Sequence, residues 1–243
     1  MLSIGNLLAV WLIFVSPVWD WWDTRALKAA PTSKARLRYY AQTIAILALS
    51  ATTACVTVGF NALFTAKGVG IHEPLLEGRS WLWWSLLILF LLFAIFQWLL
   101  PVTQVIVKYR ELRYIEMAQL RPLRFVLPAS AIEGRWYAAL ALTAAISEEL
   151  LVRGFLIRYL HTFPFHVPLL PAVICSAVIF GLNHIYQGGK GAVVTGITGL
   201  IFTSIFLVTG TLAAGMLFHA VTNLSVLLYW RPKPAISWRA EQA

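Results

Sequence analysis

Charged side chains are scarce in this sequence: Asp, Glu, Lys and Arg together make up 12% of the residues, against 60% hydrophobic residues. The mean hydropathy of +0.76 lies far outside the range of soluble globular domains. The composition therefore excludes a soluble domain and predicts an all-α, polytopic transmembrane helical bundle. At about 20 residues per span, 243 residues accommodate about seven spans.

Cysteine is also scarce, and both residues, Cys55 and Cys175, lie within apolar runs. This placement is typical of small buried side chains and argues against a disulfide framework or a thiolate metal site. The sequence also lacks internal repeats, low-complexity tracts, a glycine-rich phosphate loop and a His-Glu-x-x-His motif. Any catalytic chemistry therefore has to come from residues scattered along the apolar runs.

Acidic residues are outnumbered by basic ones, 10 to 19. Most of the basic residues lie in short segments between apolar runs, which favours a role in membrane topology and no nucleic-acid partner. Segments 23–40 and 108–135 are basic, so we expect both to be cytoplasmic. The first apolar run lacks the basic start and the cleavage site of a signal peptide, and we interpret it as a retained span. The N-terminus is then outside and the C-terminus is cytoplasmic.

The apolar runs predict spans at about 2–19, 41–64, 81–107, 136–159, 172–184, 192–208 and 212–230, the fifth starting after Pro168 and Pro171. An amphipathic helix is expected along the cytoplasmic surface around residues 109–116. The chain thus divides into N-terminal spans with a cytoplasmic surface segment (1–135), a catalytic membrane core (136–230) and a cytoplasmic tail (231–243).

Two adjacent acids, Glu148 and Glu149, interrupt the fourth apolar run. A charge at bilayer depth costs about 2.5–3.5 kcal/mol on insertion scales, so such residues are partnered, hydrated or functional. Glu149 and Arg153 stand four residues apart and can pair on one face of a helix, whereas Glu148 points about 100° away. For Glu149 and Arg153, a purely structural role in holding helices together is the alternative interpretation.

Two later spans also carry polar residues into the membrane. His184 ends the fifth span, four residues after Phe180, and the seventh span carries His219 and Asn223, also four residues apart. A histidine or asparagine alone in a membrane is often only a packing residue. Together with Glu148 they supply a general base and hydrogen-bond donors, which hydrolysis of a buried peptide bond requires.

The motifs Glu148-Glu149-x-x-x-Arg153, Phe180-x-x-x-His184 and His219-x-x-x-Asn223 follow one another on successive spans. This pattern resembles the CPBP family, the CAAX prenyl proteases and bacteriocin-processing enzymes also called Abi proteins. The resemblance covers residues 136–230. It implies that Glu148 and His184 activate water, that His219 and Asn223 act on the oxyanion, and that Arg153 orients Glu149.

Metal use is left open by the sequence. Glu148, His184 and His219 are enough ligands for an open three-ligand zinc site. The family is described both as metalloproteases and as metal-independent glutamate proteases. We favour the metal-independent mechanism, in which a buried carboxylate serves as the base.

The function implied by this resemblance is an intramembrane endopeptidase that cuts near the C-terminus of a membrane-anchored or lipid-modified protein or peptide. The candidate substrates are a prenylated CAAX protein, a bacteriocin-like peptide and a protein with a sorting tag, and the expected location is a bacterial plasma membrane. Two other classes use the same residues differently. One is a proton- or ion-coupled transporter, and the other is a non-catalytic scaffold or immunity protein.

Overall fold

Helices connected by short turns make up the described part of the chain, and its one isolated β-bridge joins Thr65 and Thr211. The computed structural model describes residues 3–69, 88, 123–162 and 165–229. The predicted all-α class is therefore confirmed. The elements are α1 (Ile4–Val10), the π-helix η1 (Trp11–Val15), α2 (Ser16–Ala29), α3 (Ser33–Val58), α4 (Phe60–Phe64), the 3-10 helix η2 (Ala66–Val69), α7 (Ala131–Glu148), the π-helix η4 (Glu149–Leu156), α8 (Ile157–His161), α9 (Leu169–Leu182), the 3-10 helix η5 (Ile185–Gln187), α10 (Gly189–Thr209) and α11 (Ala213–Tyr229).

The first apolar run forms one continuous helix from α1 through η1 to α2. Ser3 caps its start, where the side-chain hydroxyl accepts a hydrogen bond from the Asn6 N–H at 3.2 Å. Pro17 has no N–H to donate and its ring crowds the preceding turn, so the chain widens into η1 just before it. The helix continues beyond the predicted end near Trp19, because no residue that breaks a helix lies between Trp19 and Pro31.

The second apolar run begins its helix earlier and ends it earlier than predicted. Thr32 caps α3 by accepting a hydrogen bond from the Ala35 N–H at 3.2 Å, which starts the helix well before residue 41. Gly59 then ends α3 with a φ of 92°, a conformation that residues with a Cβ rarely adopt. The predicted span to Phe64 is therefore broken, and α4 follows as a separate short helix.

The acidic pair lies on a third continuous helix, formed by α7, η4 and α8. Ser130 caps its start by accepting a hydrogen bond from the Glu133 N–H at 3.3 Å. Near its middle the hydrogen bonding widens from the α to the π pattern over the eight residues of η4. π-Helical segments of this kind are rare and are frequently found at functional sites.

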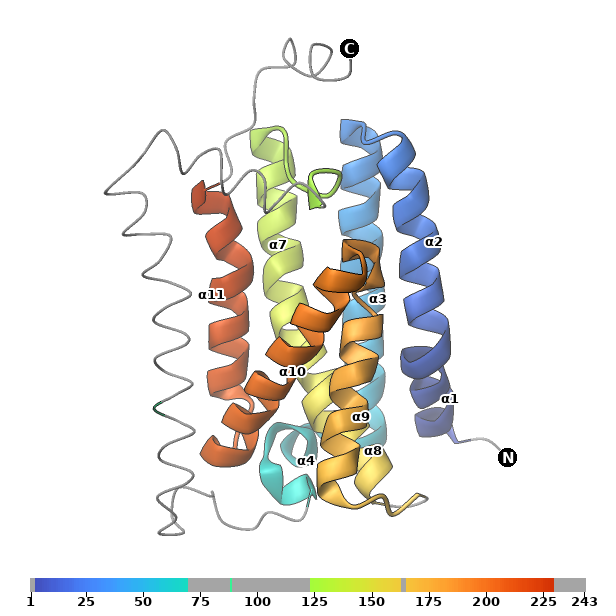
Figure 1. The fold of residues 1–243 in the computed structure, drawn as a ribbon, viewed down its shortest axis with the longest axis vertical. Coiled ribbons are helices and arrows are strands. Elements are labelled where there is room, and N and C mark those ends of the chain that lie inside the picture. The colour runs from blue at the N-terminus through green and yellow to red at the C-terminus, as the bar shows by residue number, and fades with distance from the viewer. Residues whose placement is uncertain (1–2, 70–87, 89–122, 163–164, 230–243) are drawn as a thin grey trace.

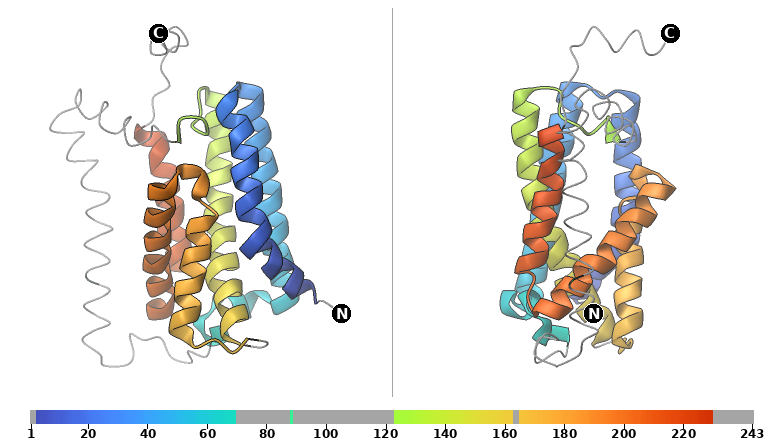
Figure 2. Two further views of the ribbon diagram at one scale, coloured as in Figure 1. Left: turned by 45° about the vertical axis from the view of Figure 1, so that its right-hand side comes forward. Right: turned by 60° about the vertical axis from the view of Figure 1, so that its left-hand side comes forward.

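The remaining helices complete a bundle around this third helix (Figure 1). α3 and α11 both pack against α7, and α10 packs against α9. α10 crosses the bundle obliquely in Figure 1 and in the right-hand view of Figure 2. The end of α2 and the starts of α3 and α7 lie together at the end of the bundle drawn uppermost in Figure 1.

Three of the described helices are long and apolar enough to cross a membrane: Ile4–Ala29, Ser33–Val58 and Gly189–Thr209. Shorter apolar helices lie at Leu169–Leu182 and Ala213–Leu227. These helices support the prediction of an integral membrane protein. The predicted span at 81–107, the surface helix at 109–116 and the tail at 231–243 lie outside the described residues, except for residue 88.

Candidate active site

Glu148 is the last residue of α7 and Glu149 the first residue of η4. In an α-helix their side chains diverge by about 100°. A π-helix bonds residues five apart, so each residue turns by a smaller angle and two neighbouring side chains diverge less. The π-helical winding thus allows both carboxylates to approach the same partner on another helix.

Arg153 forms the predicted ion pair with Glu149, and both side chains are fully buried. Arg153 Nη1 donates to Glu149 Oε1 at 3.1 Å, and Nη2 donates to the Gly199 carbonyl at 3.2 Å. The guanidinium also lies over the ring of Phe180, 4.5 Å from its centroid. A Cβ on Gly199 would lie 3.4 Å from Nη2 and 3.0 Å from the Phe180 ring, so glycine allows α10 to approach closely.

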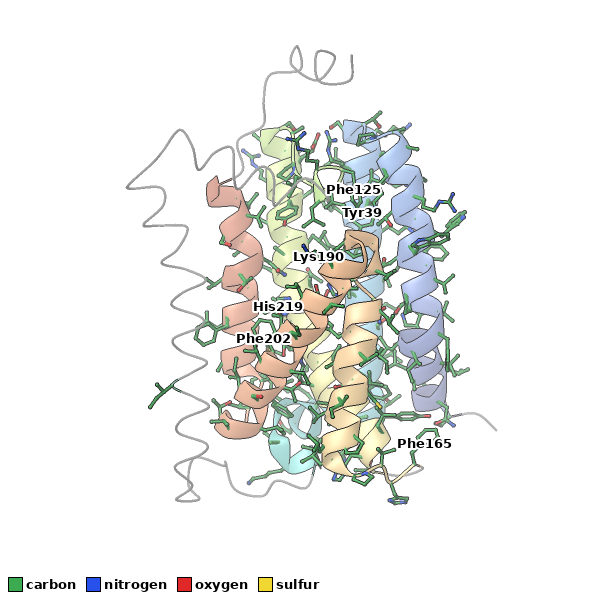
Figure 3. All side chains as sticks on the ribbon, viewed as in Figure 1. Tyr39, Phe125, Phe165, Lys190, Phe202 and His219 are labelled. Carbon is green, nitrogen blue, oxygen red and sulfur yellow. The ribbon has the colours of Figure 1, made fainter. Side chains whose placement is uncertain are left out.

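His219 contacts both carboxylates from α11. Its Nδ1 lies 3.0 Å from Glu149 Oε1, and its Nε2 lies 3.6 Å from Glu148 Oε2. Because an ionised carboxylate only accepts hydrogen bonds, Nδ1 carries the hydrogen in this arrangement. The imidazole stacks on Phe202 at a centroid distance of 5.1 Å, which fixes the plane of the ring (Figure 3). Glu149 therefore orients His219 so that its second nitrogen faces Glu148.

Glu148 lines a partly open cavity of about 320 Å³. Its side chain is 17% exposed, whereas the neighbouring Glu149 is fully enclosed and does not line the cavity. The Glu148 Oε2 atom is buried and has no hydrogen-bond partner among the described residues. At 3.6 Å, the separation from His219 Nε2 is too long for a direct hydrogen bond. Because Oε2 is enclosed, the 17% exposure of Glu148 belongs to its other side-chain atoms, and these are the atoms that face a molecule in the cavity.

His184 lines the same cavity from the turn after α9. Its Nδ1 lies 2.8 Å from the carbonyl oxygen of Phe180, and the two rings are 4.7 Å apart in an edge-on arrangement. Because a carbonyl only accepts, Nδ1 carries the hydrogen when the imidazole is neutral, and Nε2 is left with its lone pair. The Phe180-x-x-x-His184 motif thus sets the tautomer of this histidine.

Asn223 follows His219 by about one helical turn on α11 and also lines the cavity. The structure therefore brings four of the predicted site residues to one cavity: Glu148, His184, His219 and Asn223. The other two, Glu149 and Arg153, lie behind it as a buried pair. The resemblance pairs Glu148 with His184. In the structure, the imidazole nearer to Glu148 is that of His219.

The predicted metal ligands Glu148, His184 and His219 all line the cavity. In the part of the chain that the structure describes, no three His, Cys, Asp or Glu side chains are placed to hold one metal ion. The side chains as arranged therefore do not fit the three-ligand zinc site.

Residues of the N-terminal helix also line the cavity, which the sequence reasoning missed. Asp20 and Trp19 of α2 reach it, as do Tyr39 of α3 and Tyr186 of η5. The sequence signal for a site residue here was weak, since Asp20 is a single acid at the end of an apolar run and is followed by tryptophans. These residues reach the cavity because of how the helices pack, and no local sequence pattern predicts that packing.

Comparison with known families supports the sequence resemblance. Residues 131–225 match the family described as "Rce1-like: Type II CAAX prenyl endopeptidase Rce1-like". The matched stretch runs from the start of α7 into α11, so it includes Glu148, His184, His219 and Asn223. Neither a curated protein nor a solved structure matches the chain. The family match is consistent with the predicted CPBP resemblance, because residues 131–225 are similar to the Rce1-like, type II CAAX prenyl endopeptidase family.

Proposed function

We propose that this protein is an intramembrane endopeptidase that hydrolyses a peptide bond near the C-terminus of a membrane-anchored or lipid-modified protein or peptide. The family match supports CAAX-type endopeptidase activity in general. The observation that carries the proposal is the arrangement around His219. Glu149 binds one ring nitrogen, and the other faces Glu148 in a cavity that His184 and Asn223 also line.

In the proposed first step Glu148 acts as the general base. A water in the cavity gives a proton to the Glu148 carboxylate while the water oxygen forms a bond to the carbonyl carbon of the substrate. His184 Nε2 accepts a hydrogen bond from the other water hydrogen and so orients the attack. The carbonyl oxygen becomes the oxyanion of a tetrahedral intermediate.

Asn223 and His219 are the proposed donors to this oxyanion. The Asn223 amide donates as it stands, whereas His219 donates through Nε2 only when that nitrogen carries a proton. In the second step the C–N bond breaks, and Glu148 returns its proton to the leaving amine nitrogen. The products are an amine and a carboxylic acid, and the acid ionises by giving its proton to the amine.

Glu148→Gln tests the proposal because it keeps the side-chain size and removes the base. We expect cleavage of a C-terminally tagged substrate in membranes to disappear while the protein still accumulates to its normal level. Glu241→Gln in the C-terminal tail is the matched control, since it removes a carboxylate elsewhere, and it should leave cleavage unchanged. Substantial cleavage by Glu148→Gln at normal abundance would rule out this mechanism.

The substrate classes are separated by a matched panel of membrane-anchored reporters. One reporter carries a prenylated C-terminal CAAX sequence, one a bacteriocin-like peptide and one a C-terminal membrane sorting tag. All three are expressed in the bacterial plasma membrane, where we expect the enzyme to act. The reporter whose cleavage depends on Glu148 identifies the class.

A further inference from the structure

The N-terminal helix, which precedes the family-matched segment, is bonded to the turn that carries His184. Asn183 ends α9 directly before this histidine. The Ser16 hydroxyl donates to Asn183 Oδ1, and Asn183 Nδ2 donates to the Leu12 carbonyl at 3.2 Å. The same Nδ2 donates to the Ile179 carbonyl at 2.9 Å. One side chain thus connects the N-terminal helix to α9.

The orientation of the Asn183 amide is set by these partners. Two carbonyl oxygens face Nδ2, and carbonyls accept but never donate, so the nitrogen has to point toward them. Oδ1 is then left to accept from Ser16. Leu12 belongs to the π-helical turn η1, where the widened winding accompanies this additional bond to its carbonyl.

A second bond holds the far side of the same turn. Lys28, near the end of α2, donates through Nζ to the Tyr186 carbonyl at 2.6 Å. Lys28 also lies over the ring of Phe125, which in turn meets Tyr186 edge-on. The N-terminal helix therefore contacts the turn on both sides of His184.

The position of the His184 ring depends on this backbone. Its Nδ1 is bonded to the Phe180 carbonyl within the same helix end, so the ring moves with the backbone of residues 180–184. A displacement of about 1 Å at a catalytic group can lower a rate by about 10²-fold. Given the role of His184 in the proposed function, we propose that Asn183 is a positioning residue for His184 and that the N-terminal helix holds it through Ser16.

Kinetics of Ser16 variants test the first part of this inference. Ser16→Ala should lower kcat by about 10-fold to 10²-fold with little change in KM, because the substrate still binds but His184 is displaced. Ser16→Thr keeps the hydroxyl and should restore most of kcat. Ser204→Ala is the matched control, since that exposed serine donates only within its own helix, to the Leu200 carbonyl at 2.9 Å.

A labelling experiment tests the attachment without using activity. The two natural cysteines are first replaced by alanine, and His184→Cys then provides the single thiol. Adding Ser16→Ala should raise several-fold the rate at which a soluble maleimide labels this thiol in membranes. Adding Ser204→Ala should leave the rate unchanged. Asn183→Ala should behave like Ser16→Ala in both experiments wherever it accumulates.

The two experiments separate this inference from the proposed function. An unchanged labelling rate in Ser16→Ala overturns the inference whatever the activity. If the wild-type protein and Ser204→Ala cleave substrate and Ser16→Ala does so equally well, positioning is also overturned while the protease survives. If the wild-type protein cleaves none of the reporters but labelling responds to Ser16→Ala, the proposed function fails and the attachment of the turn stands.

Discussion

At the scale of single residues, Arg153 is the site residue whose burial depends most on its partners. It is a fully buried cation whose hydrogen bonds go to Glu149 and to the Gly199 carbonyl. Taking a guanidinium out of water is unfavourable, and here it is compensated by a buried carboxylate, a carbonyl and the faces of two aromatic rings. Removing one of these partners leaves the desolvation of the guanidinium incompletely compensated.

We therefore expect Arg153→Ala to destabilise the fold by about 3–5 kcal/mol, because it leaves Glu149 buried without its cation. The measurement is the thermal midpoint in detergent together with the amount of protein in membranes. Arg38→Ala is the control, because the Arg38 side chain is 62% exposed and its bond to Asp23 is 3.3 Å long. Asp23 is buried but Arg38 is in solvent, so we expect a smaller loss than for the fully buried pair of Arg153. Equal losses in the two variants would contradict the role assigned to Arg153.

Metal removal tests the other prediction made for the site residues. The described side chains do not converge as three ligands of one ion, and we expect purified enzyme to keep its activity after treatment with a strong chelator. Metal content measured on the same sample should be well below one ion per chain. Loss of activity with recovery on adding zinc would instead assign Glu148, His184 and His219 to a metal site.

One pairing in the candidate site was predictable from the sequence, but the contacts of His219 and Asn183 were not. The spacing of Glu149 and Arg153 predicts their ion pair, which the structure shows. The contacts of His219 with both carboxylates were missed, because an α-helix directs Glu148 and Glu149 apart and a π-helix has no compositional signature. The hydrogen bond between Asn183 and Ser16 was missed because the two residues are 167 positions apart in the sequence.

At the scale of elements, one ion pair ties the start of α3 to the start of α7. Arg36 Nε donates to Glu133 Oε2 at 2.6 Å, and Nη2 donates to Oε1 at 3.3 Å. Glu133 precedes the apolar run that begins at Trp136 and is 1% exposed. Burial by itself would raise the pKa of Glu133, but hydrogen bonds from Arg36, Ser33 and the Ala129 N–H outweigh it and lower the pKa to about 2.

This lowered pKa predicts a pH dependence of stability. The ordinary pKa of the Glu133 carboxyl is 4.5, so its stabilising contribution is fully present above about pH 4.5 and is lost as the pH falls toward about 2. Glu133→Gln removes the titrating group, and we expect the stability of that variant to vary less over this range than that of the wild type. Thermal unfolding in detergent between pH 7 and pH 3 measures the difference. Parallel curves for the two proteins would show that Glu133 is not the group responsible.

The boundaries of the elements were predictable where a local cap or an apolar run defines them. Apolar runs placed the described spans on the correct stretches of sequence, and α10 differs from its predicted span by a few residues. The errors are in helix ends that were placed from the length of the apolar run alone. The end of α3 at Gly59 depends on one residue with positive φ, and the extension of α2 to Ala29 depends on the absence of a breaker before Pro31.

At the scale of the whole molecule, the arrangement of helix ends bears on topology. The basic segment 23–40 spans the end of α2 and the start of α3, which lie at the same end of the bundle as the start of α7 (Figure 1). Basic residues are retained in the cytoplasm, so we predict that this end is cytoplasmic and that the N-terminus is outside.

Reporter fusions measure this prediction. A fusion after Arg36 should report the cytoplasm, and a fusion after Thr211, in the turn between α10 and α11, should report the outside. The second fusion is the internal control, because its position lies at the opposite end of the bundle from the first (Figure 1). An external signal from the fusion after Arg36 would invert the topology and the side from which the site is reached.

The buried pair of Glu149 and Arg153 also constrains how the protein is inserted into the membrane during synthesis. The helix from Ala131 to His161 carries Glu148, Glu149 and Arg153, and each ionisable side chain costs about 2.5–3.5 kcal/mol when a helix enters the bilayer alone. Two of the groups that bind this trio, the Gly199 carbonyl and His219, are translated later. During biosynthesis, this helix is therefore expected to remain beside the translocon until α10 and α11 emerge, and the membrane core is completed only as the last part of the chain arrives.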